Sequence, residues 1–130
     1  MRISKKSQYG LRAMVYLAKF PGKIFSLKKI SKAEGIPFDY LEKIFSKLEK
    51  AGLIKAKKGV RGGYFLAKKP EKIKIGEVIK ALEGQTVLVS CFKSFCPLKR
   101  KCLAKNFWQK LNQAINFSLN SVTLADLIKK

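Results

Sequence analysis

Three predicted helices in the N-terminal part of the chain limit what it can fold into. Apolar side chains recur at i, i+3, i+4 and i+7 through residues 11–18 and again through 41–48, which is typical of helices with one buried face. A shorter helix is predicted between them, beginning at Ser26, because serine caps helix starts well. Residues 34–37 (EGIP) form a tight turn before the third helix, since Gly35 readily adopts a left-handed conformation.

A basic, glycine-rich hairpin is predicted directly after these helices. Two short apolar runs, 53–56 and 64–67, flank a tip at 57–63. Helix, helix, turn, helix and hairpin is the order of a winged helix-turn-helix. The sequence therefore predicts a mainly α fold, a winged helix-turn-helix DNA-binding domain with a small β-hairpin wing. The alternative is a small helical domain whose hairpin has no role in DNA binding.

The C-terminal part adds further helices around a loop that contains every cysteine. Residues 75–84 form one amphipathic helix, and a longer one is predicted from about Leu103. We divide the chain into a DNA-binding domain, 1–84, and a cysteine loop with a long C-terminal dimerisation helix, 85–130. Helix-turn-helix proteins usually read paired half-sites, so this helix predicts a homodimer. Alternatively, the helix covers the winged domain of its own chain. The segment TLAD at 123–126 resembles a capping box.

The charge of the chain indicates an anionic partner. Lys and Arg number 29 against 8 Asp and Glu, which gives a formal net charge of +21, and there is no histidine. So much positive charge repels itself unless an anion offsets it, and nucleic acid is the commonest such partner. A lysine-rich surface that only aids solubility is the alternative. The missing histidine and the scattered carboxylates leave no assembled acid–base site, so we expect no enzyme.

Neither a membrane span nor a secretory signal is predicted. No stretch approaches the roughly 18 consecutive apolar residues of a membrane-spanning helix. The N-terminal residues MRISKKSQYG lack the apolar core of a signal peptide. We therefore expect a cytoplasmic protein with reduced thiols and without a membrane partner.

Double-stranded DNA would contact this fold at the start of the third helix and at the wing. There, Asp39 or Glu42 could accept from a cytosine amino group, and Lys43 could reach a guanine edge. The alternative for the two acidic residues is ordinary helix chemistry, namely stabilising the helix start and pairing with a lysine. The candidate DNA-binding residues are Pro37, Asp39, Tyr40, Glu42, Lys43, Ser46 and Lys47 in the helix and Lys57, Lys58 and Arg61 in the wing, with Lys5, Lys6 and Arg12 as further phosphate contacts.

All three cysteines lie in the basic segment SCFKSFCPLKRKC, residues 90–102. Basic neighbours favour the thiolate, which is the form that binds metals. The odd number of cysteines argues against a purely disulfide-based framework. Zinc sites and iron–sulfur clusters want about four ligands, so a metal at Cys91, Cys96 and Cys102 needs one more donor from elsewhere. The spacing alone leaves a metal or cluster, thiol redox switching and simple packing open.

Over nearly all of its length the chain resembles the Rrf-two (Rrf2) family of winged-helix regulators, which includes IscR-like and NsrR-like members. The matching segments are MRISKKSQYGLRAMVYLA, PFDYLEKIFSKLEKAGLI, KGVRGGYFLAKKP, IKIGEVIKALEG and TLADL, together with the three cysteines. The resemblance implies a homodimeric DNA-binding transcription regulator, a repressor. It also implies that an iron–sulfur cluster, with two or four irons, is held by Cys91, Cys96 and Cys102 and sets the affinity for the operator.

The resemblance also indicates what the cluster senses and where its fourth ligand could lie. The spacing of the cysteines is closer to that of the nitric-oxide-sensing members. Lys105 stands where some members have a histidine ligand, and Gln8 stands where nitric-oxide sensors commonly have an aspartate ligand, so Gln8 is the candidate fourth ligand. Pro37 replaces a serine that contacts phosphate in many members. The expected signal is nitric oxide, redox or iron–sulfur status. The alternatives are a cluster-free regulator that uses thiol oxidation, zinc or a small metabolite, and a basic RNA-binding protein.

Overall fold

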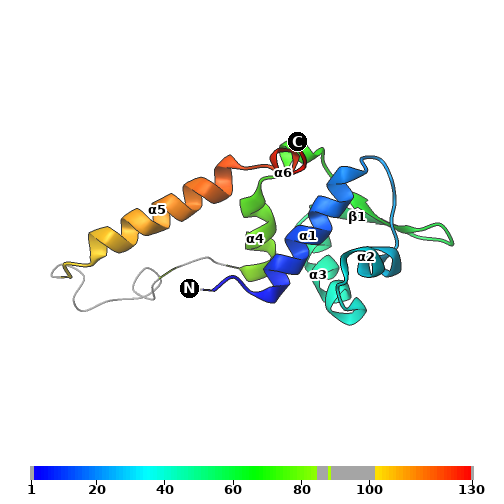
Figure 1. The fold of residues 1–130 in the computed structure, drawn as a ribbon, viewed down its shortest axis with the longest axis horizontal. Helices are drawn as coiled ribbons and strands as arrows, with labels where there is room; N and C mark the ends of the chain where they lie inside the picture. Colours follow the sequence, from blue (N-terminus) through cyan, green and yellow to red (C-terminus); the bar gives the residue numbers. More distant parts are fainter. Residues whose placement is uncertain (1, 85–87, 89–101, 130) are drawn as a thin grey trace.

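The computed structural model of the protein describes residues 2–84, 88 and 102–129, and it is mainly helical with a small hairpin (Figure 1). The elements are α1 (Lys5–Lys19), α2 (Leu27–Glu34), α3 (Phe38–Lys50), β1 (Ile54–Lys57), β2 (Gly63–Leu66), the short 3₁₀ helix η1 (Pro70–Lys72), α4 (Ile75–Glu83), α5 (Lys105–Ser121) and α6 (Leu124–Ile128). The predicted mainly α fold with a two-stranded hairpin is confirmed. None of the helices in the described part of the chain has the length and apolar character needed to span a bilayer.

The helix-turn-helix begins and ends at residues that satisfy the free backbone groups of helix ends. The Ser26 side chain accepts a hydrogen bond from the Lys29 amide at 3.1 Å, so the predicted cap of α2 is confirmed. Gly35 ends α2 in the left-handed conformation, with φ of +66°. Ile36, the next residue, is buried and anchors the turn, which leaves α3 to start at Phe38.

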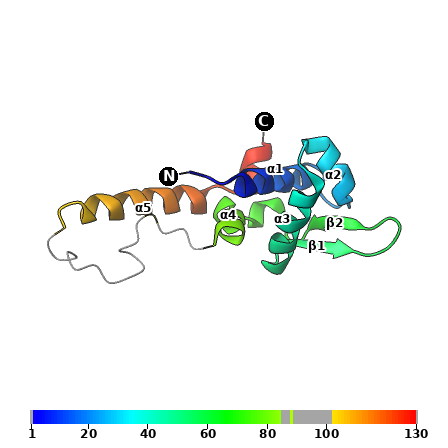
Figure 2. The same cartoon turned by 90° about the horizontal axis from the view of Figure 1, so that it is seen from below.

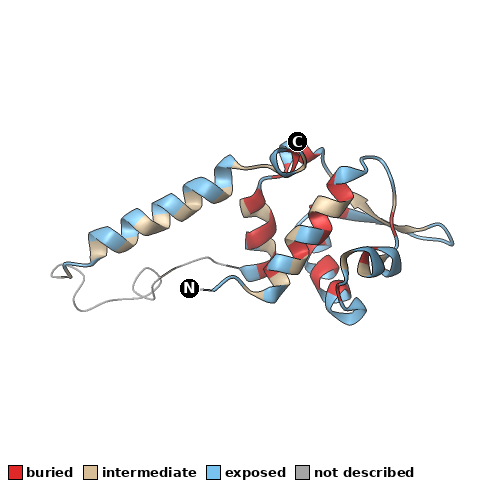
Figure 3. Ribbon diagram, viewed as in Figure 1, coloured by how far each residue is buried: buried red, intermediate tan, exposed pale blue. Residues whose placement is uncertain are grey.

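The core lies between α1, α3 and α4, where the buried residues of Figure 3 concentrate. Its centre contains Met14 and Leu17 of α1, Leu41, Ile44, Phe45 and Leu48 of α3, and Val78 and Leu82 of α4. Each large apolar side chain buried in this way stabilises the fold by about 1.5–3 kcal/mol relative to an exposed one. The buried face of α3 is the predicted one, so its opposite face must point to solvent.

The wing is fastened to the core at its base. β1 and β2 pair antiparallel, from Ile54 opposite Leu66 to Lys57 opposite Gly63. The strands thus shift by one residue towards the tip relative to the predicted runs. At the base, Phe25 and Tyr64 exchange two backbone hydrogen bonds of 3.0 and 2.8 Å. The tip extends away from the helices, as Figure 2 shows.

The C-terminal part leaves the body of the molecule as α5 and returns to it as α6. α5 projects outward in Figure 1, and none of its residues is buried. The helix starts at Lys105 rather than at Leu103, which is fully exposed, because a turn that closes with a bond from the Lys105 amide to the Cys102 carbonyl precedes it.

α6 completes the core of the N-terminal part. Thr123 and Asp126 form the predicted capping box, in which each side chain accepts from the other residue's amide. Leu124 is fully buried in the same core as α1, and its amide donates to the Ile73 carbonyl at 2.9 Å. The division of the chain after residue 84 stays a prediction, but α6 packs with the first part.

Candidate nucleic-acid interface

The outer face of α3 exposes every residue that the sequence predicted to contact DNA in this helix. These residues are Pro37, Asp39, Tyr40, Glu42, Lys43, Ser46 and Lys47. Their positions are fixed because the opposite face of α3 is anchored in the core. Pro37 occupies the N-cap position and has no side chain that could accept from the first amides of the helix. Those amides can therefore meet an anionic acceptor.

The two acidic candidates on α3 differ in what else they could do. Asp39 lies in the first turn, where a carboxylate also stabilises the positive end of the helix. Glu42 is exposed, and in the described part of the chain it is within ion-pair distance of no Lys or Arg. Its carboxylate is thus accessible to a base edge, and its role in reading cytosine stays a prediction.

Side chains from α1 support the start of α3. The ring of Tyr9 meets the ring of Tyr40 edge-on, with centroids 5.4 Å apart. Lys5 and Arg12 flank the same Tyr9 ring at 5.7 and 5.8 Å from its centroid. Arg12 also pairs with the Glu34 carboxylate at 3.5 Å and donates to the Glu34 carbonyl, which holds the end of α2 against α1. Arg12 is thus engaged in supporting the helix-turn-helix.

The wing presents Lys57, Lys58 and Arg61 to solvent, as its basic composition predicted. Two glycines make its tip possible. Gly59 has a φ of +116°, and a side-chain carbon at Gly62 would overlap the Lys57 carbonyl oxygen. The wing therefore offers three cationic side chains on a narrow support, which suits contact with phosphates.

One aromatic contact ties the wing to the recognition helix. The rings of Phe45 in α3 and Tyr64 in β2 meet edge-on, with centroids 5.0 Å apart. Burial raises the pKa of the Tyr64 hydroxyl, and the nearby charges of Glu49 and Glu42 raise it further. Tyr64 therefore stays neutral at physiological pH, and its contact with Phe45 joins the base of the wing to α3.

Sequence reasoning missed a polar cluster behind this surface. Ser7 is fully buried and donates to the Glu83 carboxylate at 2.5 Å, and Ser4, the N-cap of α1, donates to the same oxygen. The two hydroxyl groups lower the pKa of Glu83. No local motif could have revealed this cluster, because its members are far apart in the sequence.

The structure describes only part of the predicted metal site. Cys102 is a half-buried free thiol that lies just before α5, whereas Cys91 and Cys96 lie outside the described residues. Within 2–84, 88 and 102–129, no three potential metal ligands come together. Gln8, the candidate fourth ligand, is exposed on α1, and its amide nitrogen donates to the Ile3 carbonyl at 2.8 Å.

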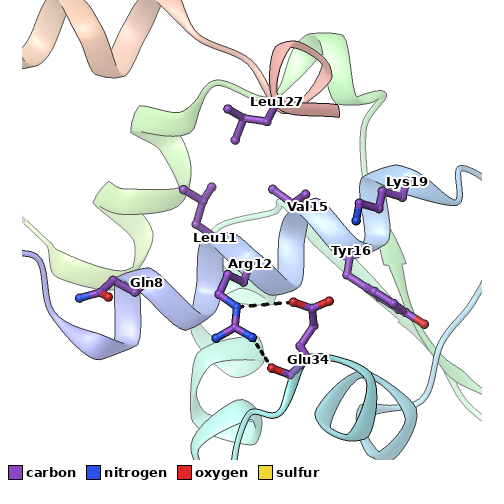
Figure 4. A pocket seen from close by; sticks show the side chains of 8 residues that line it. All are labelled: Gln8, Leu11, Arg12, Val15, Tyr16, Lys19, Glu34 and Leu127. Carbon is purple, nitrogen blue, oxygen red and sulfur yellow. Dashed lines mark hydrogen bonds and ion pairs between the residues drawn. The ribbon is translucent and has the colours of Figure 1, made fainter. Parts of the chain in front are cut away.

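Gln8 also lines a pocket of about 220 Å³ on the side of α1 that faces α6 (Figure 4). The other lining residues are Leu11, Arg12, Val15, Tyr16, Lys19, Glu34 and Leu127. Leu11 and Val15 project from α1 towards Leu127 of α6, which is 45% exposed. The floor of the pocket is thus apolar, and its polar groups lie at its edge.

Comparisons with known proteins agree with this geometry. A family model described as an iron-dependent transcriptional regulator matches residues 3–130. The protein rrf2 of Nitratidesulfovibrio vulgaris is 37% identical over 132 residues, which cover 99% of this chain and 88% of the relative. The solved structure of T. potens IscR is 37% identical, with a TM-score of 0.81 over 98% of this chain and 86% of that one.

Two further solved structures are as similar. CymR, the global cysteine regulator of B. subtilis, is 38% identical, with a TM-score of 0.82 over 98% of this chain and 95% of that one. The oxidised form of Staphylococcus aureus CymR is 34% identical, with a TM-score of 0.79 over 100% of this chain and 98% of that one. Because the family match spans almost the whole chain, the protein belongs to the Rrf2 family of winged-helix transcription regulators.

Proposed function

We propose that the protein is a homodimeric repressor whose affinity for a double-stranded operator is set by an iron–sulfur cluster. Cys91, Cys96 and Cys102 would hold the cluster, and nitric oxide, redox or iron–sulfur status would be its signal. One observation carries the proposal: every thiol of the chain lies in a single basic segment of a winged-helix regulator.

DNA binding is the better-supported half of the proposal. The candidate residues are exposed on α3 and at the tip of the wing, two elements that the Phe45–Tyr64 contact joins. The formal net charge of +21 supplies long-range attraction to a polyanion. Phosphate contacts by the wing would fix the register of the protein on DNA, and the start of α3 would read base edges.

The donor set fits a cluster with an open or weakly held fourth position. Three thiolates supply most of the ligands that iron–sulfur clusters use, and the basic side chains around them offset the negative charge of the thiolates. Gln8 could add an amide oxygen, a weaker ligand than a carboxylate. When bound, such a cluster supplies a redox-active centre whose potential depends on its ligands and exposure.

The position of the segment suggests how its state could reach the DNA-binding surface. Its last cysteine lies just before α5, and its first follows the end of α4, a core helix. A change in the segment would therefore alter how α5 is placed, and with it the spacing of two winged domains in a dimer. A tens-fold change in operator affinity requires only about 2 kcal/mol of such coupling.

Anaerobic purification tests the cluster directly. We expect bound iron and acid-labile sulfide, visible absorption, and loss of all three when the cysteines are replaced by serine. Ser94→Ala in the same segment is the matched control and should keep the iron. A colourless, iron-free protein that still changes its operator affinity in response to nitric oxide or oxidants would contradict the cluster proposal.

The second candidate is a cluster-free regulator that responds to thiol oxidation. The likeness to the oxidised form of Staphylococcus aureus CymR favours considering it. This candidate predicts that peroxide changes operator affinity in iron-free protein and that a thiol reductant reverses the change. Mass spectrometry of the oxidised cysteines separates it from the cluster mechanism, because the latter requires iron for any response.

A further inference from the structure

The apex of the wing carries an apolar side chain that the fold does not use. Val60 is fully exposed, with an exposed fraction of 106%, so it adds nothing to the core. A single exposed valine needs no explanation on an ordinary surface, but the apex of a tight turn usually holds Gly, Pro, Asn, Asp or Ser. A β-branched apolar residue stabilises neither this turn nor the core, and its position in the basic wing indicates a contact outside the chain.

A tight turn fixes Val60 and Arg61 at the apex. The Gly62 amide donates to the Gly59 carbonyl at 3.0 Å, which closes a four-residue turn with Val60 and Arg61 at its two central positions. The other three residues of the segment 59–63 are glycines, so Val60 and Arg61 supply every side chain of the apex. The tip points away from the helices (Figure 2). One apolar and one cationic side chain therefore lead the wing towards any partner.

The narrow apex and its connection to α3 suit the minor groove of DNA. In the proposed function, on which this inference rests, the start of α3 occupies the major groove. The contact between Phe45 and Tyr64 joins the base of the wing to α3, so the tip would reach the DNA beside that groove. The minor groove is only about 6 Å wide, and an apex with two side chains is slender enough to enter it. Arg61 fits this position, because arginine is favoured in narrow minor grooves.

We propose that Val60 is a specificity-determining residue that faces the floor of the minor groove and disfavours G·C pairs there. Guanine presents an amino donor in the minor groove, whereas A·T pairs present acceptors alone. The side chain of Val60 has no acceptor and would separate this amino group from water, which leaves a donor without a partner. The specificity arises from a penalty against G·C rather than from a bond to A·T.

This role differs from that of the wing lysines. Contacts of Lys57 and Lys58 with phosphate would strengthen binding to every sequence, because the phosphate backbone carries no base information. Val60 would instead make the wing sensitive to sequence. In the proposed dimer each wing would act in this way once, so the preference for A·T pairs would occur twice in a two-fold operator.

Three duplexes of alternating sequence, with A·T, G·C or inosine–cytosine (I·C) pairs, test the proposal without knowledge of the operator. Inosine lacks the amino group of guanine but keeps its major-groove edge. The full-length wild type is compared at one salt concentration with Val60→Thr, whose hydroxyl can accept from the amino group. We expect the wild type to bind the I·C duplex about 10-fold more tightly than the G·C duplex, which is the cost of one unpaired donor. Val60→Thr should lose most of this preference.

The controls separate reading of the minor groove from general effects on affinity. Val60→Ile stays apolar and should keep the preference for I·C over G·C. Lys58→Gln removes an exposed charge of the wing and should weaken binding to all three duplexes by the same factor, so that the preference is unchanged. Thermal unfolding of all three variants should match that of the wild type, because both positions are exposed.

The same preference for I·C over G·C in wild type and Val60→Thr would overturn the role of Val60, because differences in duplex shape affect both proteins alike. An equal loss of affinity for all three duplexes in Val60→Thr would do the same, since Val60 would then add contact area without reading the pairs. If the wild type binds no duplex even at low salt, the proposed DNA-binding function fails together with this inference. A wild type that binds the three duplexes equally well removes the inference alone.

Discussion

The substitution Gly10→Ala adds one methyl group, which has two opposing effects on the stability of the fold. In most helices Gly→Ala stabilises, by up to about 1 kcal/mol, because alanine has the higher helix propensity. Here the added carbon would overlap Leu82 Cδ1 in the core. Overpacking of this kind costs about 1–3 kcal/mol. We therefore predict that Gly10→Ala lowers the free energy of unfolding in urea despite its better helix propensity.

The control for Gly10→Ala is a double-mutant cycle with Leu82→Ala. Leu82→Ala alone creates a cavity, and the methyl group at Gly10 would partly fill it, so the two changes together should cost less than their sum. An equal or higher stability of the single Gly10→Ala variant would mean that Leu82 can move aside freely.

The contribution of the Glu83 carboxylate to the stability of the fold depends on pH. The hydroxyl groups of Ser4 and Ser7 lower the pKa of Glu83 below its usual value. A carboxylate with a lowered pKa stabilises the fold above its unfolded pKa of about 4.3, and this contribution is lost as pH falls through the folded pKa. Glu83→Gln should therefore be less stable than wild type at neutral pH, by about 1 kcal/mol because the group is exposed.

The difference between wild type and Glu83→Gln should shrink as the pH falls below the unfolded value, and chemical denaturation at several pH values measures it. Glu71→Gln, at an exposed position in η1, is the matched control and should leave the pH profile of stability unchanged. A difference that stays constant down to strongly acidic pH would show that the charge of Glu83 adds nothing to its hydrogen bonds.

Among the elements, the wing depends on one close backbone approach. A side-chain carbon at Gly63 would overlap the Phe25 carbonyl oxygen and lie 2.8 Å from the Ser26 amide nitrogen. Gly63→Ala should therefore break the backbone pairing of Phe25 with Tyr64 and lower stability by about 1–3 kcal/mol. Amide hydrogen exchange at Tyr64 should become faster, and the salt slope of DNA binding should fall as the tip moves.

Lys55→Ala is the control for Gly63→Ala, because Lys55 is exposed in strand β1 and lies opposite Phe65 rather than Gly63. In Lys55→Ala, amide hydrogen exchange at Tyr64 should match that of the wild type. Unchanged exchange in Gly63→Ala itself would mean that the wing can relax without losing its attachment to the segment before α2.

The elements that sequence predicts well here are those set by local signals. Ser26, Gly35 and the capping box at Thr123 mark helix ends through bonds to residues close in the chain, and all three are confirmed. The start of α5 was misplaced because periodicity alone extended the helix back to Leu103. A turn that the apolar pattern does not encode delays the helix to Lys105.

Contacts between distant segments could not be predicted in this way. Nothing in the sequence indicates that the Ser7 hydroxyl is buried against the Glu83 carboxylate. Surface exposure on α3, in contrast, followed directly from the buried stripe on its other side.

At the scale of the whole molecule, α5 is an arm on a packed body. The C-terminal end of α5 lies against α4, where the Leu119 carbonyl comes close to Gly76, and the rest projects outward (Figure 1). Although no residue of α5 is buried, it carries Leu111 and Ile115 one turn apart on a half-buried apolar stripe. A second copy of the chain is the proposed cover for this stripe.

We predict that Ile115→Glu converts the proposed dimer to a monomer without unfolding the body. A hot-spot residue at the centre of an interface contributes about 2 kcal/mol or more. A two-fold interface contains each substitution twice, so the loss is about 4 kcal/mol and dimerisation should weaken on the order of 1,000-fold. Analytical ultracentrifugation measures this change. Thermal unfolding of the body should stay close to wild type, because α5 adds no buried residue to its core.

Gln113→Glu introduces the same charge at an exposed position of α5 and should leave the dimer intact. If Ile115→Glu is a monomer, its binding to an operator with two half-sites should weaken, because each winged domain then binds alone. Binding to a single half-site should be unchanged, since α3 and the wing are intact. A dimer that persists in Ile115→Glu would place the two-fold contact elsewhere, and α5 would then have to pack against its own chain.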